Sequence, residues 1–326
     1  MNGKKFKLQK FKINKMEKNN IEFERVSWND EALVIKNCKE EDLCYIEDLF
    51  SQISLYSKEL FVSQDFFKSL QGKIKTPNNC NISAFEENKI KDKKIDILFS
   101  LGGDGTLLDT LSVVKNTTLP VLGINLGHLG FLTSVGRNEI KNLLSEIEKG
   151  NYKVEKHSVL KATYLSSKEE RFAINEVCVR SLSPGELLEI DAYIGDEYLT
   201  TYTSDGLIAT TPTGSTAYSM SCGGPIISPN SRCLCITPIS PHNLTLRPLI
   251  IPDDSLIRFV INDSRKGISL HLDSQTYPLD TPISIEISKA DMELSLIRMQ
   301  NQTFFSAIRN KLMWGTNLRQ RKSNDE

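Results

Sequence analysis

The chain has 326 residues, of which 39% are hydrophobic and 25% are charged, a composition typical of a globular protein and unlike that of a fibrous or largely disordered one. Its formal net charge of −1 creates no overall field that would attract nucleic acid, and no stretch approaches the roughly 20 apolar residues of a membrane-spanning helix. We therefore predict neither a nucleic-acid nor a membrane partner, and the length predicts two domains.

The first 20 residues are strongly basic, since they hold seven lysines and a single acid, Glu17. They lack a sustained apolar face, so we predict a disordered tail over residues 1–20. No apolar segment follows this tail, which argues against secretion. The seven cysteines are odd in number and scattered, and Cys233 and Cys235 lack the two-residue gap of common zinc sites. This pattern predicts reduced thiols and a cytoplasmic protein.

Strand-like and helix-like segments alternate over the first half of the chain. Short apolar runs are typical of buried parallel strands, and apolar residues at helical spacing separate them. This order predicts a doubly wound α/β domain over residues 21–153. The segments are a strand at 32–35, a helix at 40–57, a helical or irregular segment at 61–70, a turn at 76–81, a strand at 95–101, a helix at 106–114, a strand at 120–125 and a helix at 137–150.

Beyond Lys153 the sequence predicts short strands separated by turns in place of long helices. Leu187–Ile194 alternates apolar and polar residues, and after a Gly-Asp turn Tyr198–Tyr202 returns, as in a β-hairpin. We predict a β-rich, sandwich-like domain over residues 154–290. Its further strands are 255–261, 268–272 and 283–288.

The last stretch, 302–314, again has helical spacing. A β sandwich offers no surface for such a helix, so we predict that it returns to the first domain, which residues 291–326 complete. The apolar residues on its one side are Phe304, Phe305, Ile308 and Leu312.

The most informative stretch is the glycine-rich turn after the strand at 95–101. Gly102, Gly103 and Gly105 let the backbone bend sharply and approach a ligand without a Cβ atom in the way. A helix opens at Thr106, so free N–H groups and the positive end of its dipole face one point. These features suit a phosphate.

Asp104 within this turn carries a charge that opposes a phosphate. We interpret it as a group that accepts a proton from a hydroxyl, or that holds Mg²⁺ between phosphates. The alternative is that Asp104 caps the helix, because aspartate is a favoured N-cap.

Three other stretches concentrate small polar residues. Asn175-Glu176 lies within an apolar strand and offers the donors and acceptors that paired ribose hydroxyls need, although an exposed strand edge would also hold such a pair. Residues 204–225 bring hydroxyls and backbone N–H groups together around glycine, as in a polar pocket wall. Residues 237–248 hold several prolines and predict a rigid irregular segment.

These residues resemble a known family. The turn Gly102–Thr106 is similar to that of a kinase superfamily that includes NAD kinases and the diacylglycerol and sphingosine kinases. Further matches, in order between about residues 95 and 275, resemble NAD kinases alone. They are 127–131, 175–176, 205–206, 211–221, 223–225 and 237–248.

The resemblance implies transfer of the γ-phosphoryl group of ATP, or of another donor, to the 2′-hydroxyl of the adenosine ribose of NAD. It implies Mg²⁺ or another divalent metal, although we assign no residue as a metal ligand. Asp104 would be the catalytic proton acceptor. The donor phosphates would lie at Gly102, Gly103, Gly105 and Thr106. The NAD-binding residues would be Asp104, Gly105, Phe131, Asn175, Glu176, Asp205, Thr216, Ala217, Tyr218, Ser219, Met220, Ser221 and Gln275.

In this family the residue at Asp205 often comes from a neighbouring subunit, so the resemblance also implies a homodimer or homotetramer with shared sites. The sequence departs from the family at two positions. Asp273-Ser274-Gln275 replaces the usual Asp-Gly-Gln, which changes the local turn, and Thr203 replaces a basic residue that would meet pyrophosphate charge.

Two other functions compete with this one. A lipid kinase of the same superfamily would need an apolar acceptor pocket, which the hydroxyl-rich stretch at 210–221 disfavours. A non-catalytic NAD(P)-binding protein on the same scaffold would bind the dinucleotide without phosphorylating it. A dehydrogenase is disfavoured because the Gly-x-Gly-x-x-Gly fingerprint is missing.

Overall fold

The computed structural model describes residues 31–35, 42–86, 95–115, 117–127, 130–133, 135–136, 139–183, 185–262, 267–300 and 302–314. The basic tail predicted at 1–20 lies outside these residues, as do residues 128–129 of the stretch 127–131.

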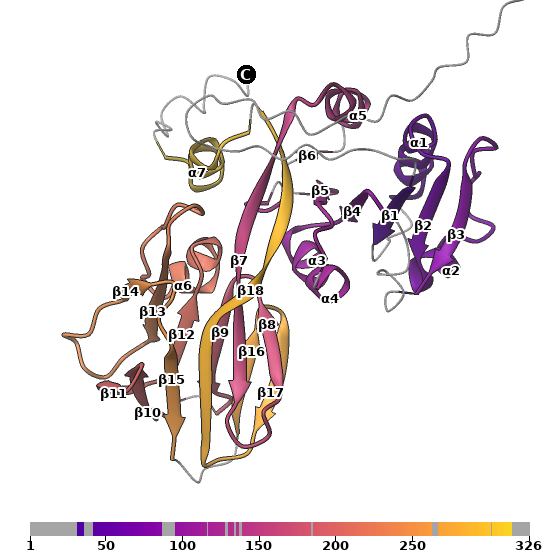
Figure 1. Ribbon diagram of the computed structural model, residues 1–326. Coiled ribbons are helices and arrows are strands. Elements are labelled where there is room, and N and C mark those ends of the chain that lie inside the picture. The colour runs from indigo at the N-terminus through magenta and orange to yellow at the C-terminus, as the bar shows by residue number, and fades with distance from the viewer. Residues whose placement is uncertain are drawn as a thin grey trace, which may run out of the picture.

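The first half of the chain folds into a parallel sheet with helices on both faces (Figure 1). Strand order is β3-β2-β1-β4-β5, so the chain reverses direction across the sheet between β1 and β4, the place where such folds bind ligands. The elements are β1 (Glu31–Ile35), α1 (Leu43–Ile53), β2 (Glu59–Ser63), α2 (Gln64–Leu70), β3 (Asn81–Phe85), β4 (Ile97–Leu101), α3 (Asp104–Asp109), α4 (Leu111–Val114), β5 (Val121–Asn125), β6 (Val135–Gly136) and α5 (Ile140–Lys149).

All five residues of β4 are buried, because helices cover both faces of this central strand. Its side chains alternate between two apolar clusters. Phe99 and Leu101 pack with α1 and α5, and Leu98 packs with α3 and α4. The continuous apolar run at 95–101 is therefore explained, as expected, by burial of β4 on both faces of the sheet.

Two local predictions were incomplete and one was wrong. Residues 61–70 are helical only from Gln64, because 61–63 end strand β2, and the predicted turn at 76–81 passes at Asn81 into strand β3, which was not predicted. Strand β2 is almost wholly buried and shows no polar alternation, whereas β3 is an edge strand in which only Phe85 is buried, so neither has a clear strand pattern in the sequence. The predicted helix 106–114 begins at Asp104 and breaks at Thr110, whose hydroxyl donates to the Leu107 carbonyl at 2.6 Å.

The second half is a β sandwich. One sheet has six antiparallel strands in the order β14-β13-β12-β9-β16-β17, and it faces β11-β10-β15-β18-β7-β8 across a shared apolar core. The elements are β7 (Tyr152–Tyr164), β8 (Glu170–Ala173), β9 (Glu176–Ser181), β10 (Leu188–Ile194), β11 (Glu197–Ser204), β12 (Gly206–Thr210), the 3-10 turn η4 (Thr213–Thr216), α6 (Tyr218–Ser221), β13 (Cys233–Ile239), β14 (Leu249–Pro252), β15 (Ile257–Ile261), β16 (Ile268–Leu272), β17 (Gln275–Leu279), β18 (Ile283–Met299) and α7 (Phe304–Leu312).

The long antiparallel pair β7–β18 joins the two halves (Figure 1). On β18, Ile287 lies in the core of the sandwich, whereas Leu294 lies in the core of the α/β half. Leu296 pairs with Val121 of β5, so β18 also extends the parallel sheet. The predicted strand at 283–288 was thus too short, since β18 continues to Met299. The domain limits of 21–153 and 154–290 stay a prediction.

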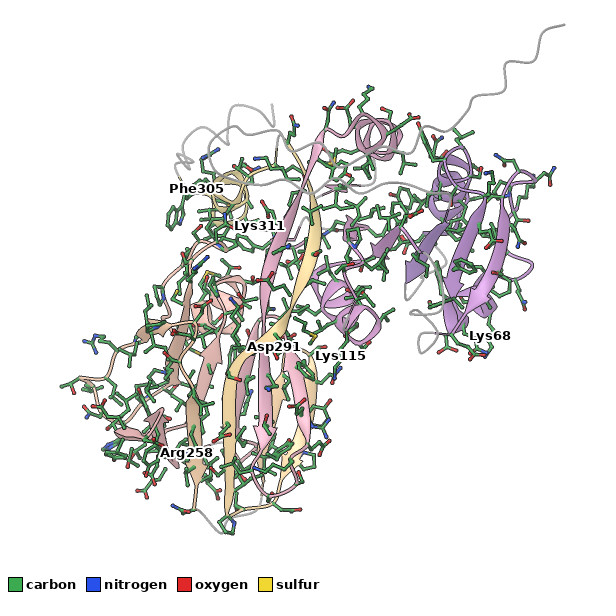
Figure 2. All side chains as sticks on the ribbon, in the orientation of Figure 1. Lys68, Lys115, Arg258, Asp291, Phe305 and Lys311 are labelled. Atoms are coloured by element: carbon green, nitrogen blue, oxygen red, sulfur yellow. The ribbon has the colours of Figure 1, made fainter. Side chains whose placement is uncertain are left out.

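Helix α7 contacts the α/β half through Lys311, which lies beside Asp104 and Phe131. Its Ile308 is buried, but Phe305 is 65% exposed and was wrongly predicted to face the protein. Figure 2 shows Phe305 on the outer side of α7 and Lys311 on the side nearer to β7 and β18.

We expect Leu294→Ala to lower the free energy of unfolding by about 2–5 kcal/mol, because it opens a cavity where β18 enters the α/β core. Urea denaturation measures this change. Asp291→Ala, at an exposed position of the same strand, is the control and should change stability by less than about 0.5 kcal/mol. Equal effects of the two substitutions would contradict the packing described here.

Candidate active site

The turn between β4 and α3 needs glycine at its first position. Gly102 has a φ of +152°, and its N–H donates to the Ile124 carbonyl at 2.9 Å. A Cβ atom there would lie 2.2 Å from the Thr106 hydroxyl oxygen. A Cβ atom at Gly103 or Gly105 would meet nothing within 4 Å, so these two positions leave open space beside the backbone for a ligand.

The Asp104 carboxylate points toward the loop at residues 130–133 and caps no helix. Its Oδ1 accepts hydrogen bonds from the Thr133 N–H at 2.9 Å, the Thr133 hydroxyl at 2.9 Å and the Leu132 N–H at 3.2 Å. Its Oδ2 accepts one, from the Phe131 N–H at 2.6 Å. The N-cap alternative is therefore wrong, and Oδ2 accepts fewer hydrogen bonds than Oδ1 and so keeps an unused lone pair.

The loop that holds Asp104 is fixed from its other side by Arg298 of β18. The guanidinium donates to the carbonyls of Phe131 at 2.7 Å and Leu132 at 2.9 Å, and to Glu155 of β7 at 3.2 Å. The backbone of this loop thus donates to a carboxylate and accepts from a cation. Sequence reasoning missed Arg298, because nothing in its apolar strand distinguishes it from a surface arginine.

Thr133 and Asn125 complete the support of Asp104. The Asn125 side-chain amide donates to the Thr133 hydroxyl at 2.9 Å, and that hydroxyl in turn donates to Asp104. A Cβ atom at Gly130 would lie 1.6 Å from Asp104 Oδ1, so the carboxylate occupies the space that this glycine leaves. The loop at residues 130–133 thus accommodates the Asp104 carboxylate. Asn125 could have been found from sequence, since it ends a buried strand directly before that loop.

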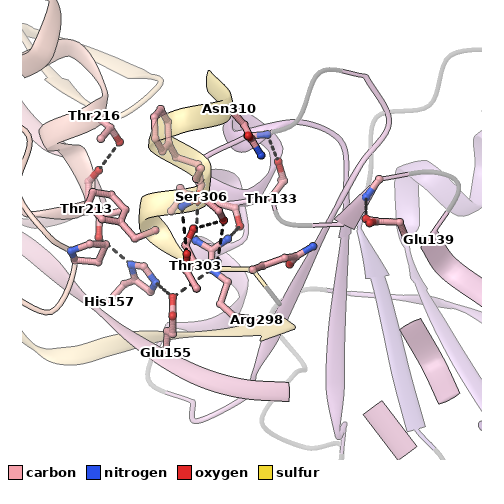
Figure 3. Close-up of a pocket in the computed structure, with 18 residues that line it drawn as sticks. Thr133, Glu139, Glu155, His157, Thr213, Thr216, Arg298, Thr303, Ser306 and Asn310 are labelled. Carbon is pink, nitrogen blue, oxygen red and sulfur yellow. Dashed lines mark hydrogen bonds and ion pairs between the residues drawn. The ribbon is translucent and has the colours of Figure 1, made fainter. Parts of the chain in front are cut away.

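A cavity of about 450 Å³ adjoins this loop (Figure 3). Phe131 lines it from the α/β half and Thr216 from the sandwich, and α7 forms a further wall. At its floor the buried His157 Nδ1 lies 2.9 Å from the Thr213 hydroxyl. Burial lowers the pKa of His157, so the ring is neutral there and adds no cation.

Asn175 and Glu176 stand where β9 begins. The Asp273 carboxylate accepts the N–H groups of Ile174 at 2.7 Å, Asn175 at 2.8 Å and Glu176 at 3.1 Å, and so fixes the backbone of this pair. Burial, assisted by Asp273, raises the pKa of Glu176 to about 8. Its Oε2 is buried and has no hydrogen-bond partner among the described residues.

The Asp-Ser-Gln departure leaves this turn intact. The residue with positive φ is Asp273, at +52°, and not Ser274, so the turn does not require the glycine usual at position 274. The Ser274 hydroxyl donates to Asp109 of α3 at 3.2 Å. Because glycine has no such group, this departure adds a link between the sandwich and the helix that begins at Asp104.

The hydroxyl-rich segment forms the turn η4 and then the short helix α6. Thr216, Ala217 and Tyr218 are partly exposed, and so is Asp205, within electrostatic reach of Tyr218. The Ser219 hydroxyl is buried against that of Thr237 at 2.9 Å, so this side chain faces the core. Met220 is partly exposed and Ser221 is exposed. The predicted irregular segment at 237–248 begins within β13, which extends to Ile239.

Gln275 lies apart from the cavity at Phe131 and Thr216. It lines a second cavity of about 260 Å³ with Asp109 and Lys115, and its side-chain oxygen accepts a hydrogen bond from Tyr277. The structure therefore brings Phe131 and Thr216 together at one cavity and places Gln275 at another.

A fixed carboxylate beside a glycine turn at the switch point of a doubly wound sheet, with a polar wall from a second domain, suits a phosphotransferase that acts on a nucleotide. Two family models match the chain: the ATP-NAD kinase N-terminal domain over residues 32–152 and the ATP-NAD kinase C-terminal domain over residues 174–299. The NAD kinase of Flavobacterium johnsoniae is 37% identical over 278 residues, which cover 84% of this chain and 94% of the relative. The chain belongs to the NAD kinase family.

Solved structures share the fold. A yeast NADH kinase complexed with NADH matches with a TM-score of 0.79 at 27% identity, and 89% of each chain is covered. An NAD kinase from Archaeoglobus fulgidus in complex with ATP matches with a TM-score of 0.65 at 22% identity, covering 87% of this chain and 98% of that one.

The predicted family, fold class and NAD⁺ kinase activity are thus confirmed. The roles of individual site residues stay predictions. In the part of the chain that the structure describes, no helix is long and apolar enough to cross a membrane.

As the pH rises from about 4.5 to 8, we expect the contribution of Glu176 to the free energy of unfolding to decrease. The reason is that folded Glu176 keeps a proton that the unfolded chain releases in this pH range. The slope from this residue is at most about 1.4 kcal/mol per pH unit. Glu176→Gln should remove that slope, so the variant gains stability over the wild type as the pH rises. Urea denaturation without ligand measures it, with the exposed Glu197→Gln as control. A difference between Glu176→Gln and wild type that is independent of pH would contradict the assignment.

Proposed function

We propose that this chain transfers the γ-phosphoryl group of ATP to the 2′-hydroxyl of the adenosine ribose of NAD, and that Asp104 Oδ2 accepts the hydroxyl proton. The single observation that carries this role is the geometry of Asp104. Three backbone N–H groups and one hydroxyl hold the carboxylate in one orientation, with Oδ2 less engaged than Oδ1.

Fixed orientation is what this reaction needs. Phosphoryl transfer gives protein groups little covalent work, so positioning and electrostatics dominate. Holding the hydroxyl and the γ-phosphorus in line lowers the barrier by roughly 7–11 kcal/mol, whereas a general base contributes about 10²–10⁴-fold. A carboxylate that is already oriented does not have to reorganise when the hydroxyl proton leaves.

The NAD would bind between the two halves of the chain. Phe131 supplies an apolar face for the adenine at the cavity it shares with Thr216. Asn175 and a protonated Glu176 offer donors and acceptors to ribose hydroxyls, and the unpartnered Glu176 Oε2 supports this role. The segment from Thr216 through Ala217, Tyr218, Ser219 and Met220 to Ser221 would line the pocket, Ser219 through its backbone.

The donor would lie at the open side of the glycine turn. Gly103 and Gly105 leave space there, and Thr106 follows within α3. Among the described residues, no group of three or more His, Cys, Asp or Glu side chains is placed to hold a metal ion. A Mg²⁺ ion that arrives with the phosphates of ATP does not need such a group, because Mg²⁺ is commonly held by one or two carboxylates together with substrate oxygens. The ion would neutralise phosphate charge during transfer.

We infer a homodimer or homotetramer in which Asp205 reaches the dinucleotide of a neighbouring subunit. Two large apolar side chains on the segment from β13 to β14 support an interface, since Leu244 is 85% exposed and Ile250 is 51% exposed. We place the enzyme in the cytoplasm, because the six cysteines of the described residues are free thiols.

An assay of NADP formation from NAD, ATP and Mg²⁺ tests the proposal, and repeating it with other triphosphates and polyphosphate identifies the donor. Diacylglycerol in place of NAD tests the lipid kinase alternative. Binding of NADP without ATP-dependent NADP formation would reject the proposal in favour of a non-catalytic binding protein.

Asp104→Asn should lower kcat by about 10²-fold or more, because the amide is a poor proton acceptor, while NAD affinity stays nearly unchanged. The structure adds a cost: an amide N–H at the Oδ2 position would face the Phe131 N–H, and an unsatisfied donor costs about 1–3 kcal/mol. Thermal denaturation should therefore accompany kinetics and calorimetric NAD titration. Wild-type turnover in this variant would remove the base assignment.

Gly105→Ala tests the predicted binding site of the phosphate donor without destabilising the protein. The added methyl group meets nothing within 4 Å, and within α3 alanine is favoured over glycine by about 1 kcal/mol, so stability should stay equal or rise. The KM for ATP should rise about tenfold or more, because the methyl group occupies space meant for phosphate. An unchanged KM would contradict the predicted donor position.

A further inference from the structure

Helix α7 brings a lysine to the catalytic carboxylate. Lys311 Nζ lies 3.9 Å from Asp104 Oδ2, the oxygen that keeps the free lone pair. The same ammonium lies 4.4 Å from the centre of the Phe131 ring, so two groups of the site define its position. Figure 2 shows Lys311 on the inner side of α7.

The position of α7 is fixed by its own sequence. Thr303 and Ser306 form a capping box, with the Ser306 N–H donating to the Thr303 hydroxyl at 3.1 Å. Ile308 is buried, one turn before Lys311. The helix follows residue 299, where the match to the C-terminal domain of the family ends, so neither matched domain contains this lysine.

Stability alone does not explain this arrangement. The side chains of Lys311 and Asp104 are 21% and 30% exposed, and ion pairs open to solvent contribute little, since ordering a lysine offsets most of the attraction. Burial lowers the pKa of Lys311 although Asp104 opposes the shift, so placing the charge there costs free energy. Arg309, which is exposed in the same last turn, already provides a positive charge that interacts favourably with the C-terminal end of the helix dipole.

The other cation near Asp104 is already engaged. Arg298 donates to two carbonyls and to Glu155. The Lys311 ammonium, by contrast, donates no hydrogen bond within 3.5 Å to the part of the chain that the structure describes. Its three N–H groups are therefore available to a ligand that lies beside Asp104 Oδ2.

We propose that Lys311 is a further catalytic residue, whose ammonium binds the phosphoryl group while it passes to the ribose hydroxyl held by Asp104. This role rests on the proposed function. The hydroxyl oxygen would sit about 2.7 Å from Oδ2. It gives its proton to Asp104 and bonds to the γ-phosphorus, and the bond to the bridging oxygen breaks with its electron pair leaving on ADP. Lys311 keeps its proton and stabilises the negative charge on the transferring oxygens.

Four variants of the full-length chain test this role in the NADP assay. Lys311→Ala should lower kcat by about 10²-fold, because loss of one donor to the developing charge costs that much in other enzymes. The NAD affinity measured by calorimetry should change less than threefold. Lys311→Arg should retain more activity than Lys311→Met, since it keeps the charge. Arg309→Met removes an exposed charge from the same turn and should behave as wild type.

Chemical rescue distinguishes catalysis from packing. Ethylammonium added to Lys311→Ala should raise kcat at least about tenfold in a saturable manner and should not affect Lys311→Met, whose side chain fills the space. Wild-type kcat in Lys311→Ala would overturn the proposal. A loss that neither arginine nor ethylammonium restores, together with a lower Tm, would also overturn it in favour of a structural role. Absence of NADP formation by the wild-type chain would instead reject the proposed function itself.

Discussion

The site depends on the hydrogen bonds between the Asp104 carboxylate and the backbone of residues 131–133. Because of these bonds, the Asp104 side chain at the start of α3 does not cap its own helix but points to the loop at residues 131–133. Its Oδ1 accepts three hydrogen bonds, whereas its Oδ2 accepts one. The carboxylate thus has a fixed direction and a single free lone pair. A flexible aspartate in the same turn would have to reorient during each turnover.

The long pair β7–β18 explains how two domains hold one small site. Arg298 and Glu155 lie on these neighbouring strands and are hydrogen-bonded to each other. Arg298 also donates to the carbonyls of Phe131 and Leu132, in the loop whose N–H groups bind Asp104. Because β18 passes through both apolar cores, the position of the loop depends on packing in both halves. The link from Ser274 to Asp109 adds a second connection at the far end of α3.

Burial and charge divide the site into two regions. Around Asn175 and Glu176 the protein is closed, and Glu176 keeps its proton because burial and Asp273 oppose its charge. Around Asp104 the site is more open, with Lys311 and the glycine turn nearby. A neutral region suits an uncharged ribose, and a region with a cation and bare backbone suits a phosphate. The polarity of each part therefore matches the part of the substrates proposed to lie there.

The sequence by itself determined the α/β and β-rich halves, the central strand and turn at 95–106, and the aspartate at its centre, because periodicity and glycine spacing are local properties. Strand β2 was lost because a short strand covered on both faces shows no alternation, and β3 was lost because it is an edge strand in which only Phe85 is buried. Arg298, Thr133 and Lys311 could not be assigned from sequence. Their contacts with Asp104 or with the loop that holds it span at least 29 positions of the chain, and Lys311 lies 207 positions from Asp104. Such contacts exist only once β18 and α7 have packed against the first domain, so the tertiary structure alone decided how the Asp104 carboxylate is held.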